Sequence, residues 1–276
     1  MNARIPAPVQ PVLQDYLQQL KARVPDLLFG VYLHGSTVYG AFCQETSDID
    51  VLVLTNGPSN EQDLGILEQL HADLRLKWPR WKLESSYVPQ SVCARPLENL
   101  GTPHPFHKDG KFCASGIFDF NSPVWAANLW WMVKTRGVSL FGPEPAALDI
   151  QISAAEMIAT NRRLVDEYWT QWTRPQAHWL RFAYRLYGLS KSSHVDWVVF
   201  GTLRTYFTLR EHDITSKLDA AEYGLAHLPG RWHRLIRDCV RNRQSPVARS
   251  LPVRVKNAWV TAQYMRFILH ACRRIP

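Results

Sequence analysis

Apolar and polar positions follow two different patterns along this chain of 276 residues. Two short apolar runs rich in β-branched residues, 27–33 and 51–54, are typical of buried strands. Leucines recur at helical spacing through 60–77 and predict an amphipathic helix, which a third predicted strand at 81–88 follows. The N-terminal part therefore predicts an α/β domain in which strands and helices alternate.

Beyond residue 150 almost every segment has apolar residues three and four positions apart, which predicts helices. Proline and glycine separate the segments. The predicted helices are 152–172, 177–187, 195–210, 216–228, 231–243 and 251–272. We therefore expect two domains, an α/β domain at 1–150 and an all-α bundle at 151–276.

A Gly-Ser pair follows the first predicted strand, and two aspartates lead into the second. Gly35 lets the backbone approach a ligand, and Ser36 offers a hydroxyl and an amide at a predicted helix start, where free N–H groups attract phosphate. Asp48 and Asp50 are two residues apart, so in a strand they project side by side, and such a carboxylate pair suits Mg²⁺. The alternative is an ordinary turn followed by two solvated acids.

A third acid lies in the strand predicted at 81–88. Glu84 is its only acidic residue, and because Leu83 and Ser85 face the opposite way, its carboxylate can share a sheet face with the two aspartates. The alternative is a solvent-exposed glutamate, since charged residues mostly face water.

Gly35-Ser36, eleven further residues and then Asp48-Ile49-Asp50 resemble the signature of the DNA polymerase β-like nucleotidyltransferases. The resemblance implies a minimal nucleotidyltransferase fold, a mixed sheet with helices. It also implies that Ser36 contacts nucleotide phosphates, and that Asp48 and Asp50 bind Mg²⁺. A third carboxylate, here Glu84, would bind metal or take the proton from the attacking hydroxyl.

Charge divides near residue 150. The net charge is +8, but residues 1–150 hold 12 Lys and Arg against 15 Asp and Glu, and residues 151–276 hold 20 against 9. Most of the basic residues can be explained as solvated helix faces. The split also predicts a basic helical half that closes over the phosphates of ATP held in a cleft between the halves.

Three further stretches, 140–143, 198–204 and 214–221, together with the helical half, resemble the aminoglycoside adenylyltransferases that modify streptomycin and spectinomycin. The resemblance implies that Arg204 and Lys217 contact the ATP phosphates. Arginine suits bidentate phosphate contact, and a lysine at a helix start adds its charge to the positive helix end.

The acceptor side departs from that family. Aligned on Arg204, the family's acidic positions fall on Ser190 and His194, and its aromatic position falls on Arg185. Asp196 is the one acid nearby, so Asp196 and His194 are the candidate substrate-binding residues. A polycationic sugar would be held poorly in such surroundings, because like charges repel in a partly desolvated pocket.

The residues and the resemblance together predict transfer of AMP from ATP to a hydroxyl of a small molecule, with an aminoglycoside as one candidate. Asp48, Asp50 and Glu84 would hold two Mg²⁺ ions, and Glu84 would act as general base. The alternative is a protein or RNA acceptor, which the basic run from Arg231 onward favours, with eleven Lys and Arg against one Asp. A nucleotide-binding module without catalysis has little need for three crowded carboxylates.

Neither a signal peptide nor a membrane-spanning apolar run is recognisable, which predicts a cytoplasmic protein with no membrane partner. The five cysteines lack the paired spacing of a disulfide framework or zinc site, so we expect free thiols. His104 and His107 are interpreted as surface histidines. In the long loop predicted at 96–122, Phe106, His107, Phe112 and Phe118 either floor an acceptor pocket or pack beneath the loop.

Overall fold

The computed structural model describes residues 5–97, 99–100, 103–115, 123–173, 192–245 and 250–276. It divides into two compact units. The first unit comprises residues 1–42 and 47–153, and the second comprises 43–46 and 154–276. The division after residue 153 lies close to the change in sequence pattern.

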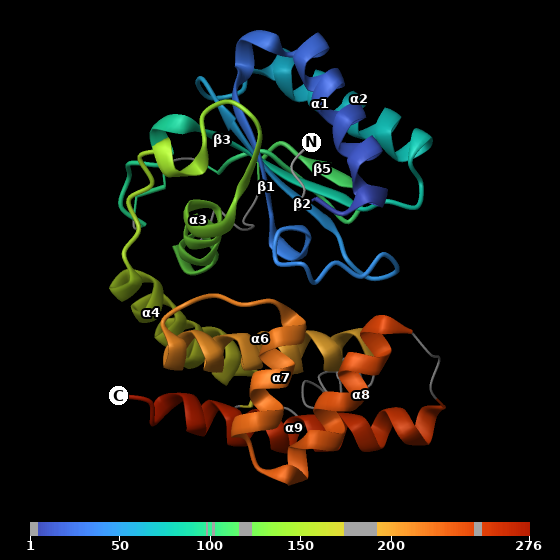
Figure 1. Cartoon of the computed structure of the whole chain (residues 1–276), viewed down its shortest axis with the longest axis vertical. Coiled ribbons are helices and arrows are strands. Elements are labelled where there is room, and N and C mark those ends of the chain that lie inside the picture. Colours follow the sequence, from blue (N-terminus) through green and yellow to red (C-terminus); the bar gives the residue numbers. More distant parts are fainter. Residues whose placement is uncertain (1–4, 98, 101–102, 116–122, 174–191, 246–249) are drawn as a thin grey trace. The chain divides into compact units, whose positions relative to one another are not determined.

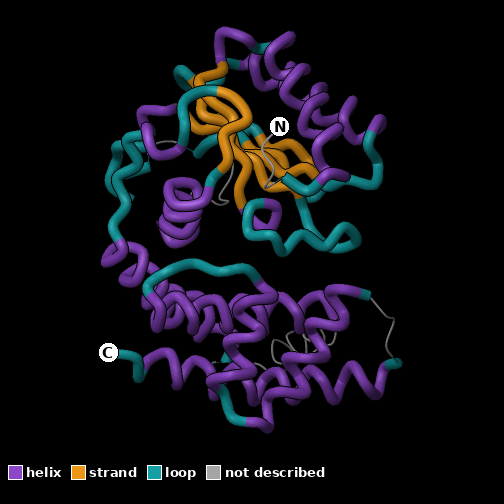
Figure 2. The backbone as a smooth tube through the Cα atoms, viewed as in Figure 1, coloured by secondary structure: helices purple, strands orange, loops and turns teal. Residues whose placement is uncertain are grey.

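The first unit is built on one mixed sheet of six strands (Figures 1 and 2). The strand order is β5-β4-β3-β2-β1-β6. β2 and β3 pair in parallel and the other pairs are antiparallel. The strands are β1 (Leu28–His34), β2 (Ile49–Thr55), β3 (Leu83–Pro89), β4 (Phe106–Lys108), β5 (Lys111–Cys113) and β6 (Val138–Phe141). The three strands predicted from apolar runs are confirmed as β1, β2 and β3.

Helices cover both faces of this sheet. α1 (Gln10–Arg23) and α2 (Glu61–Lys77) lie together on one face, and α3 (Pro123–Arg136) lies on the other (Figure 1). α2 confirms the helix predicted over 60–77. Short 3-10 helices complete the unit: Ala7–Val9, Pro25–Leu27, Gly35–Thr37, Gln90–Val92 and Pro145–Ala147.

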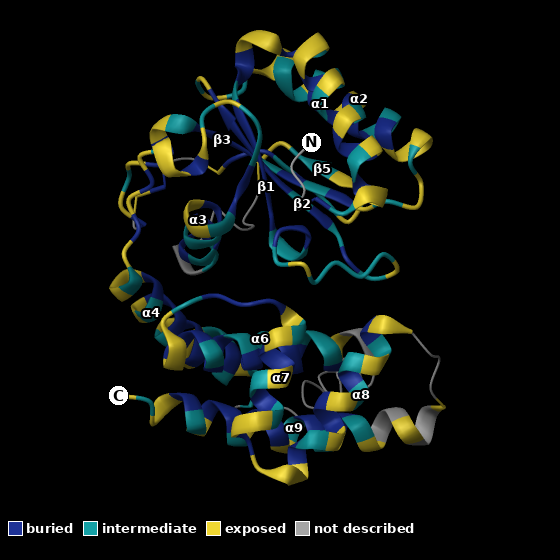
Figure 3. Cartoon of the chain, in the orientation of Figure 1, coloured by how far each residue is buried: buried dark blue, intermediate teal, exposed yellow. Residues whose placement is uncertain are grey.

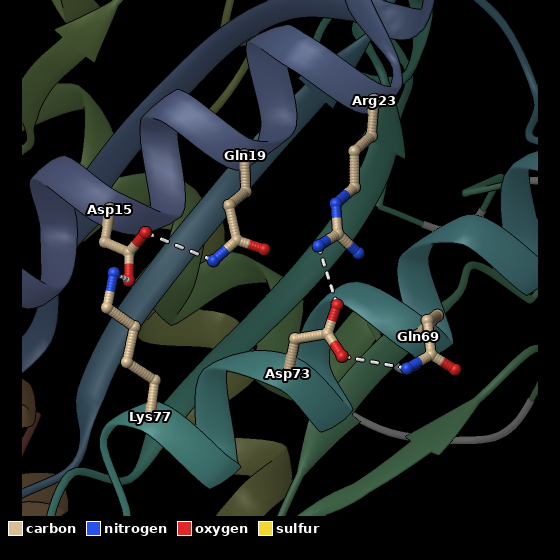
Figure 4. Close-up of polar contacts among 6 residues, drawn as sticks. All are labelled: Asp15, Gln19, Arg23, Gln69, Asp73 and Lys77. Carbon is tan, nitrogen blue, oxygen red and sulfur yellow. Dashed lines mark hydrogen bonds and ion pairs between the residues drawn. The ribbon is translucent and has the colours of Figure 1, made fainter.

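Two ion pairs tie α1 to the C-terminal part of α2 (Figure 4). The guanidinium of Arg23 lies 2.6 Å from the carboxylate of Asp73, and the Lys77 ammonium lies 2.8 Å from the carboxylate of Asp15. At the start of α2, Asn60 and Asp63 form a capping box, each side chain accepting from the backbone N–H of the other. A cap of this kind contributes about 1 kcal/mol and sets where the helix begins.

Strand alternation assigns each residue to one sheet face. Odd-numbered residues of β2, such as Ile49 and Val51, belong to the core under α1 and α2, whereas Leu52 and Leu54 belong to the core under α3. Figure 3 shows the strands as the buried layer between the helices. Because both faces are covered, the strands carry nearly continuous apolar runs.

The sequence did not predict the β4–β5 hairpin, which lies inside the loop expected at 96–122. Asp109 and Gly110 form its two-residue turn with φ values of +49° and +74°. Asp-Gly with positive φ at both positions is the signal of a type I′ hairpin turn. The strands flanking it have three residues each, too few for a period-two pattern to stand out.

His107 is buried rather than exposed, so the prediction of a surface residue is wrong. Its ring stacks on that of His71 at a centroid distance of 4.0 Å, and its Nδ1 donates to the carbonyl of Leu83 at 2.8 Å. The His71 ring also stacks on Phe112. His107 and Phe112 therefore pack against α2. His104 is buried as well, with Nε2 3.1 Å from the Leu100 carbonyl, and Phe118 lies outside the described residues.

The second unit is helical in the segments that the structure describes. It contains α4 (Ala154–Arg163), which continues into a π-helix (Leu164–Trp169) and a 3-10 turn (Thr170–Trp172). Further along the chain come α6 (Ser192–Glu211), α7 (Lys217–His227), a 3-10 turn (Gly230–Trp232), α8 (His233–Gln244) and α9 (Leu251–Arg273). Five of the six predicted helices are confirmed, and 177–187 lies outside the described residues. α6 is the central element, packing against α4, α7, α8 and α9.

As predicted, the structure forms no disulfide at any of the five cysteines, all of which it describes: Cys43, Cys93, Cys113, Cys239 and Cys272. Within the described part of the chain, each helix is too short or too polar to cross a membrane.

The stacked histidines make the first unit sensitive to acid. Burial, and then the neighbouring ring, lower the pKa of His71 well below its ordinary value, and burial lowers the pKa of His107. Below about pH 6.5 the unfolded chain takes up protons that the folded unit resists, so the free energy of unfolding falls, by up to about 1.4 kcal/mol per pH unit for each histidine.

We expect His107→Phe, which keeps a stacked ring without a titrating group, to flatten this dependence. Urea unfolding between pH 7.5 and 5, followed by tryptophan fluorescence, measures the slope. His270→Gln, at an exposed position of α9, is the control. Equal slopes for all three proteins would contradict the assignment.

Candidate active site

A tight turn connects β1 to the segment that leads into β2. Gly35, Ser36 and Thr37 form a single 3-10 turn, which the Thr37 hydroxyl closes by donating to the His34 carbonyl at 2.7 Å. The prediction of a helix starting at Ser36 is therefore wrong, because the structure has only a three-residue 3-10 turn here. A loop without further helix runs from Gly40 to Asp48, so the amide of Ser36 belongs to a turn and carries no long helix dipole.

Gly35 lies directly against the carboxylate of Asp50. Its φ is +67°, in the left-handed region that favours glycine. A Cβ placed on Gly35 would lie 2.1 Å from Oδ2 of Asp50, so any side chain here would displace the carboxylate. The glycine thus allows the turn and the acid to share one place.

Asp50 and Glu84 are direct neighbours across the parallel pair of β2 and β3. Both lie at even-numbered positions near the start of their strands, on the sheet face that packs under α3. The register of β1 adds His34 opposite Asp50. Continued by one residue, the β3–β4 register places Lys108 opposite Glu84. A row of polar side chains therefore crosses one end of the sheet, and we call it the transverse row.

Asp48 immediately precedes β2, two residues before Asp50. Its carboxylate lies 3.9 Å from the ammonium of Lys82 and is about one third exposed. Its charge acts on Glu84, whose pKa it helps to raise. Across the residues described, no group of three His, Cys, Asp or Glu side chains is close enough to hold a metal ion. The three predicted acids share one end of the sheet without forming a closed cluster.

Glu84 is more enclosed than Asp48, with its side chain 14% exposed against 37%. Burial raises the pKa of its carboxyl above the ordinary value; the Lys108 ammonium, 3.6 Å away, lowers it, and Asp48 raises it. The backbone N–H of Asp109 also donates to the carboxylate. Glu84 is therefore a partly buried carboxylate that the β4–β5 hairpin supports by a charge and an amide.

His34 occupies the other end of the transverse row. It is buried, and burial lowers its pKa to about 3, so the imidazole is neutral at physiological pH. Its Nδ1 makes no hydrogen bond within the described part of the chain. A neutral ring beside Asp50 cannot neutralise the carboxylate, so the charge of the neighbouring acids is left to cations.

In the second unit, Arg204 and Lys217 both lie near the N-terminus of α7. Arg204 lies on α6, and its Nε donates to the carbonyl of Thr215 at 3.0 Å. Two residues later, Lys217 is exposed at the first position of α7, whose N-cap is Ser216. Arg204 of α6 and Lys217 of α7 are 13 positions apart in sequence, and the fold brings both to the N-terminal end of α7.

Asp196 and His194 do not converge. They are two positions apart on α6, which places them on different sides of the helix. Asp196 accepts a hydrogen bond from the amide of Asn242 on α8, and His194 is exposed. Asp196 is therefore hydrogen-bonded within the helix bundle, to α8.

The sequence interpretation missed Lys108 and His34 as members of the site. His34 precedes Gly35 in the motif, and the period-two pattern could have placed it on the face of Asp50. Lys108 could have been found from the Asp109-Gly110 turn, which predicts a hairpin, although the partner strand of that hairpin is set only by the fold.

Two family models match the chain. Residues 13–99 match the nucleotidyltransferase domain, and residues 193–273 match the C-terminal domain of aminoglycoside adenylyltransferase. The first match contains the turn, both aspartates and Glu84. The second contains Arg204 and Lys217. A sequence search of curated proteins found no match.

Seven chains of solved structures match the fold. One is the crystal structure of spectinomycin adenyltransferase AAD(9) from Enterococcus faecialis with ATP and spectinomycin. The match has a TM-score of 0.67 and 14% sequence identity, and it covers 95% of this chain and 99% of that chain. At this identity the likeness establishes a shared fold over nearly the whole length of both chains.

We expect Gly35→Ala to destabilise the first unit more than Gly40→Ala. Both glycines have a φ near +70°, so each substitution introduces about 1 kcal/mol of backbone strain. At Gly35 the new methyl group also meets the carboxylate of Asp50, and this overpacking adds roughly 1–3 kcal/mol. At Gly40 no atom of the described residues lies within 4 Å of the new methyl group, so the strain stands alone. Urea unfolding of both variants measures the difference, and equal losses would contradict the close approach of Gly35 to Asp50.

Proposed function

We propose that this chain, a nucleotidyltransferase with an aminoglycoside adenylyltransferase C-terminal domain, transfers AMP from ATP to a hydroxyl group of a small molecule. The observation that carries the proposal is the contact of Gly35 with Asp50, which in turn pairs with Glu84 across the parallel strands. A phosphate-binding turn and two carboxylates then meet at one end of the sheet. Five cysteines without a disulfide suit a reducing compartment, and we propose the cytoplasm.

The carboxylates are suited to hold Mg²⁺. Asp48, Asp50 and Glu84 offer hard oxygen ligands, and like charges directly opposite each other on adjacent strands repel unless a cation intervenes. We propose that these three residues hold two ions. When bound, Mg²⁺ polarises the phosphoryl oxygens and stabilises the charge on the leaving pyrophosphate.

We propose that Glu84 acts as the general base. It accepts the proton of the acceptor hydroxyl, whose oxygen forms a bond to the α-phosphorus while the bond from that phosphorus to the bridging oxygen breaks. Burial raises the pKa of Glu84, which makes its carboxylate a stronger proton acceptor than an exposed glutamate. Pyrophosphate leaves, and the acceptor keeps AMP.

The remaining groups orient the nucleotide. The hydroxyl and amide of Ser36 bind phosphate oxygens at the turn beside Asp50, and Arg204 and Lys217 provide positive charge to the phosphates. The structural neighbour was solved with ATP and spectinomycin, and an aminoglycoside is one candidate acceptor here. Asp196 and His194 stay candidates for the acceptor side.

We expect Asp48→Asn, Asp50→Asn and Glu84→Gln each to lower the rate of AMP transfer by about 10³-fold or more, equivalent to roughly 4 kcal/mol of barrier. The assay uses labelled ATP and Mg²⁺ with streptomycin, spectinomycin, total RNA and cell lysate as acceptors. Chelation with EDTA should abolish transfer, and added Mg²⁺ should restore it. Asp26→Asn, at an exposed position, is the charge-matched control. Unchanged transfer in a folded Asp50→Asn protein would refute the mechanism.

We expect Arg204→Gln and Lys217→Gln to raise the KM for ATP by roughly tenfold each, because each removes a phosphate contact worth about 1–2 kcal/mol. Steady-state kinetics with varied ATP measures the change. Lys256→Gln, at an exposed position of α9, removes the same charge elsewhere in the second unit and should leave KM unchanged. A KM unaffected by either substitution would remove both residues from the ATP site.

A macromolecular acceptor is the alternative, and one observation favours it. Arg234, Arg237 and Arg241 are exposed on α8, with spacing that places them along one side of the helix. Such a row attracts a phosphate backbone. Label found in RNA or protein rather than in a drug would decide for this alternative, and RNA binding would then weaken steeply with salt.

A further inference from the structure

The transverse row has an ordered sequence of charges. From β1 to β5 it contains neutral His34, the acids Asp50 and Glu84, and then Lys108 and Lys111, which are partners across the hairpin. Because cross-strand partners share a face, both lysines belong to the face of the acids. Positive charge is therefore concentrated at one end of the row.

The position of Lys108 is set by the backbone. It is the last residue of β4, directly before the two-residue turn of Asp109 and Gly110. Three contacts hold this hairpin: the Asp109 N–H donates to Glu84, His107 donates to the Leu83 carbonyl, and Arg75 of α2 donates to the Gly110 carbonyl at 3.2 Å. The ammonium of Lys108 thus lies next to Glu84 on a hairpin that is held to both β3 and α2.

The proposed reaction places the acceptor at this end of the row. The phosphates lie at the turn after β1, and the general base Glu84 must touch the acceptor hydroxyl. Lys108 lies 3.6 Å from Glu84, on the side away from Asp50. Once Asp48, Asp50 and Glu84 are committed to Mg²⁺, an acceptor beyond Glu84 meets the ammonium groups of Lys108 and Lys111 and the carboxylate of Asp109, whose charge also acts on Glu84. The two lysines outnumber the one acid, so the net fixed charge of the hairpin is positive.

We propose that Lys108 selects the acceptor by charge: the enzyme favours neutral or anionic hydroxyl compounds and disfavours polycationic ones. The inference rests on the proposed function and names the substrate class of the same site. A fixed ammonium repels an amine brought close to Glu84 and attracts a carboxylate or phosphate at the same place. Lys108 is therefore a specificity-determining residue of the acceptor site.

The test compares acceptors that share a ring and differ in charge. Glucose, glucuronate and glucosamine, together with streptomycin and spectinomycin, are offered with ATP and Mg²⁺ at slightly acidic pH, where the amines are charged. The wild-type kcat/KM for glucose or glucuronate should exceed that for glucosamine by about tenfold or more, the effect of one nearby charge. Lys108→Gln should remove most of this preference, mainly through KM.

Two variants separate the charge from other roles of the residue. Lys108→Arg keeps the charge and should keep the preference. Lys111→Gln removes the same charge one strand farther from Glu84 and should change the preference by less than about twofold, because the interaction weakens with distance and exposure. Equilibrium binding of the three sugars to proteins loaded with Mg²⁺ and an ATP analogue that cannot be cleaved at the α-phosphorus gives a second readout that does not depend on turnover.

The outcomes are distinguishable. Efficient transfer to cationic acceptors by the wild type, or equal losses on all acceptors in Lys108→Gln, would overturn the selection by charge and leave the transfer reaction standing. Absence of transfer to every acceptor offered, by a folded protein that binds ATP, would overturn the reaction and the inference with it.

Discussion

The repulsion between Asp50 and Glu84 is the constraint on which the rest of the site depends. The parallel pairing of β2 and β3 puts the two acids opposite each other, and the side chain of Glu84 is only 14% exposed, so little water screens its charge. Such an arrangement costs stability unless cations approach. Of the neighbouring groups, the neutral imidazole of His34 adds no charge, and the ammonium of Lys108 partly offsets the charge of Glu84.

Gly35 links this electrostatic problem to the backbone. The carboxylate of Asp50 occupies the space that a side chain at position 35 would fill. The turn after β1 therefore presents its amides beside the acid that is proposed to hold Mg²⁺. The close approach of this turn to the carboxylate requires a residue without a side chain, and a glycine with a φ of +67° meets that requirement.

The β4–β5 hairpin gives the acid row a basic end. It is attached to α2 through Arg75 and through the ring stack of His71 and His107, so contacts on the sheet face under α1 and α2 set where Lys108 lies on the opposite face. Alternation along β4 allows this, because His107 points to α2 while Lys108 shares the face of Glu84. Packing on one side of the sheet thereby sets charge on the other.

The sequence by itself determined the strands around the motif, the helix over 60–77 and the helical character of the second half, because each has a local apolar period or a cap. It also made Asp48, Asp50 and Glu84 candidates from local spacing, although Asp48 lies just before β2 rather than within it, and Glu84 belongs to β3. Only the tertiary structure decided that β2 and β3 are neighbours, that His107 is buried and that Lys108 faces Glu84. Strand order and the partners of short strands are set by packing between residues far apart in sequence. The three residues of β4 are also too few to show an alternating pattern.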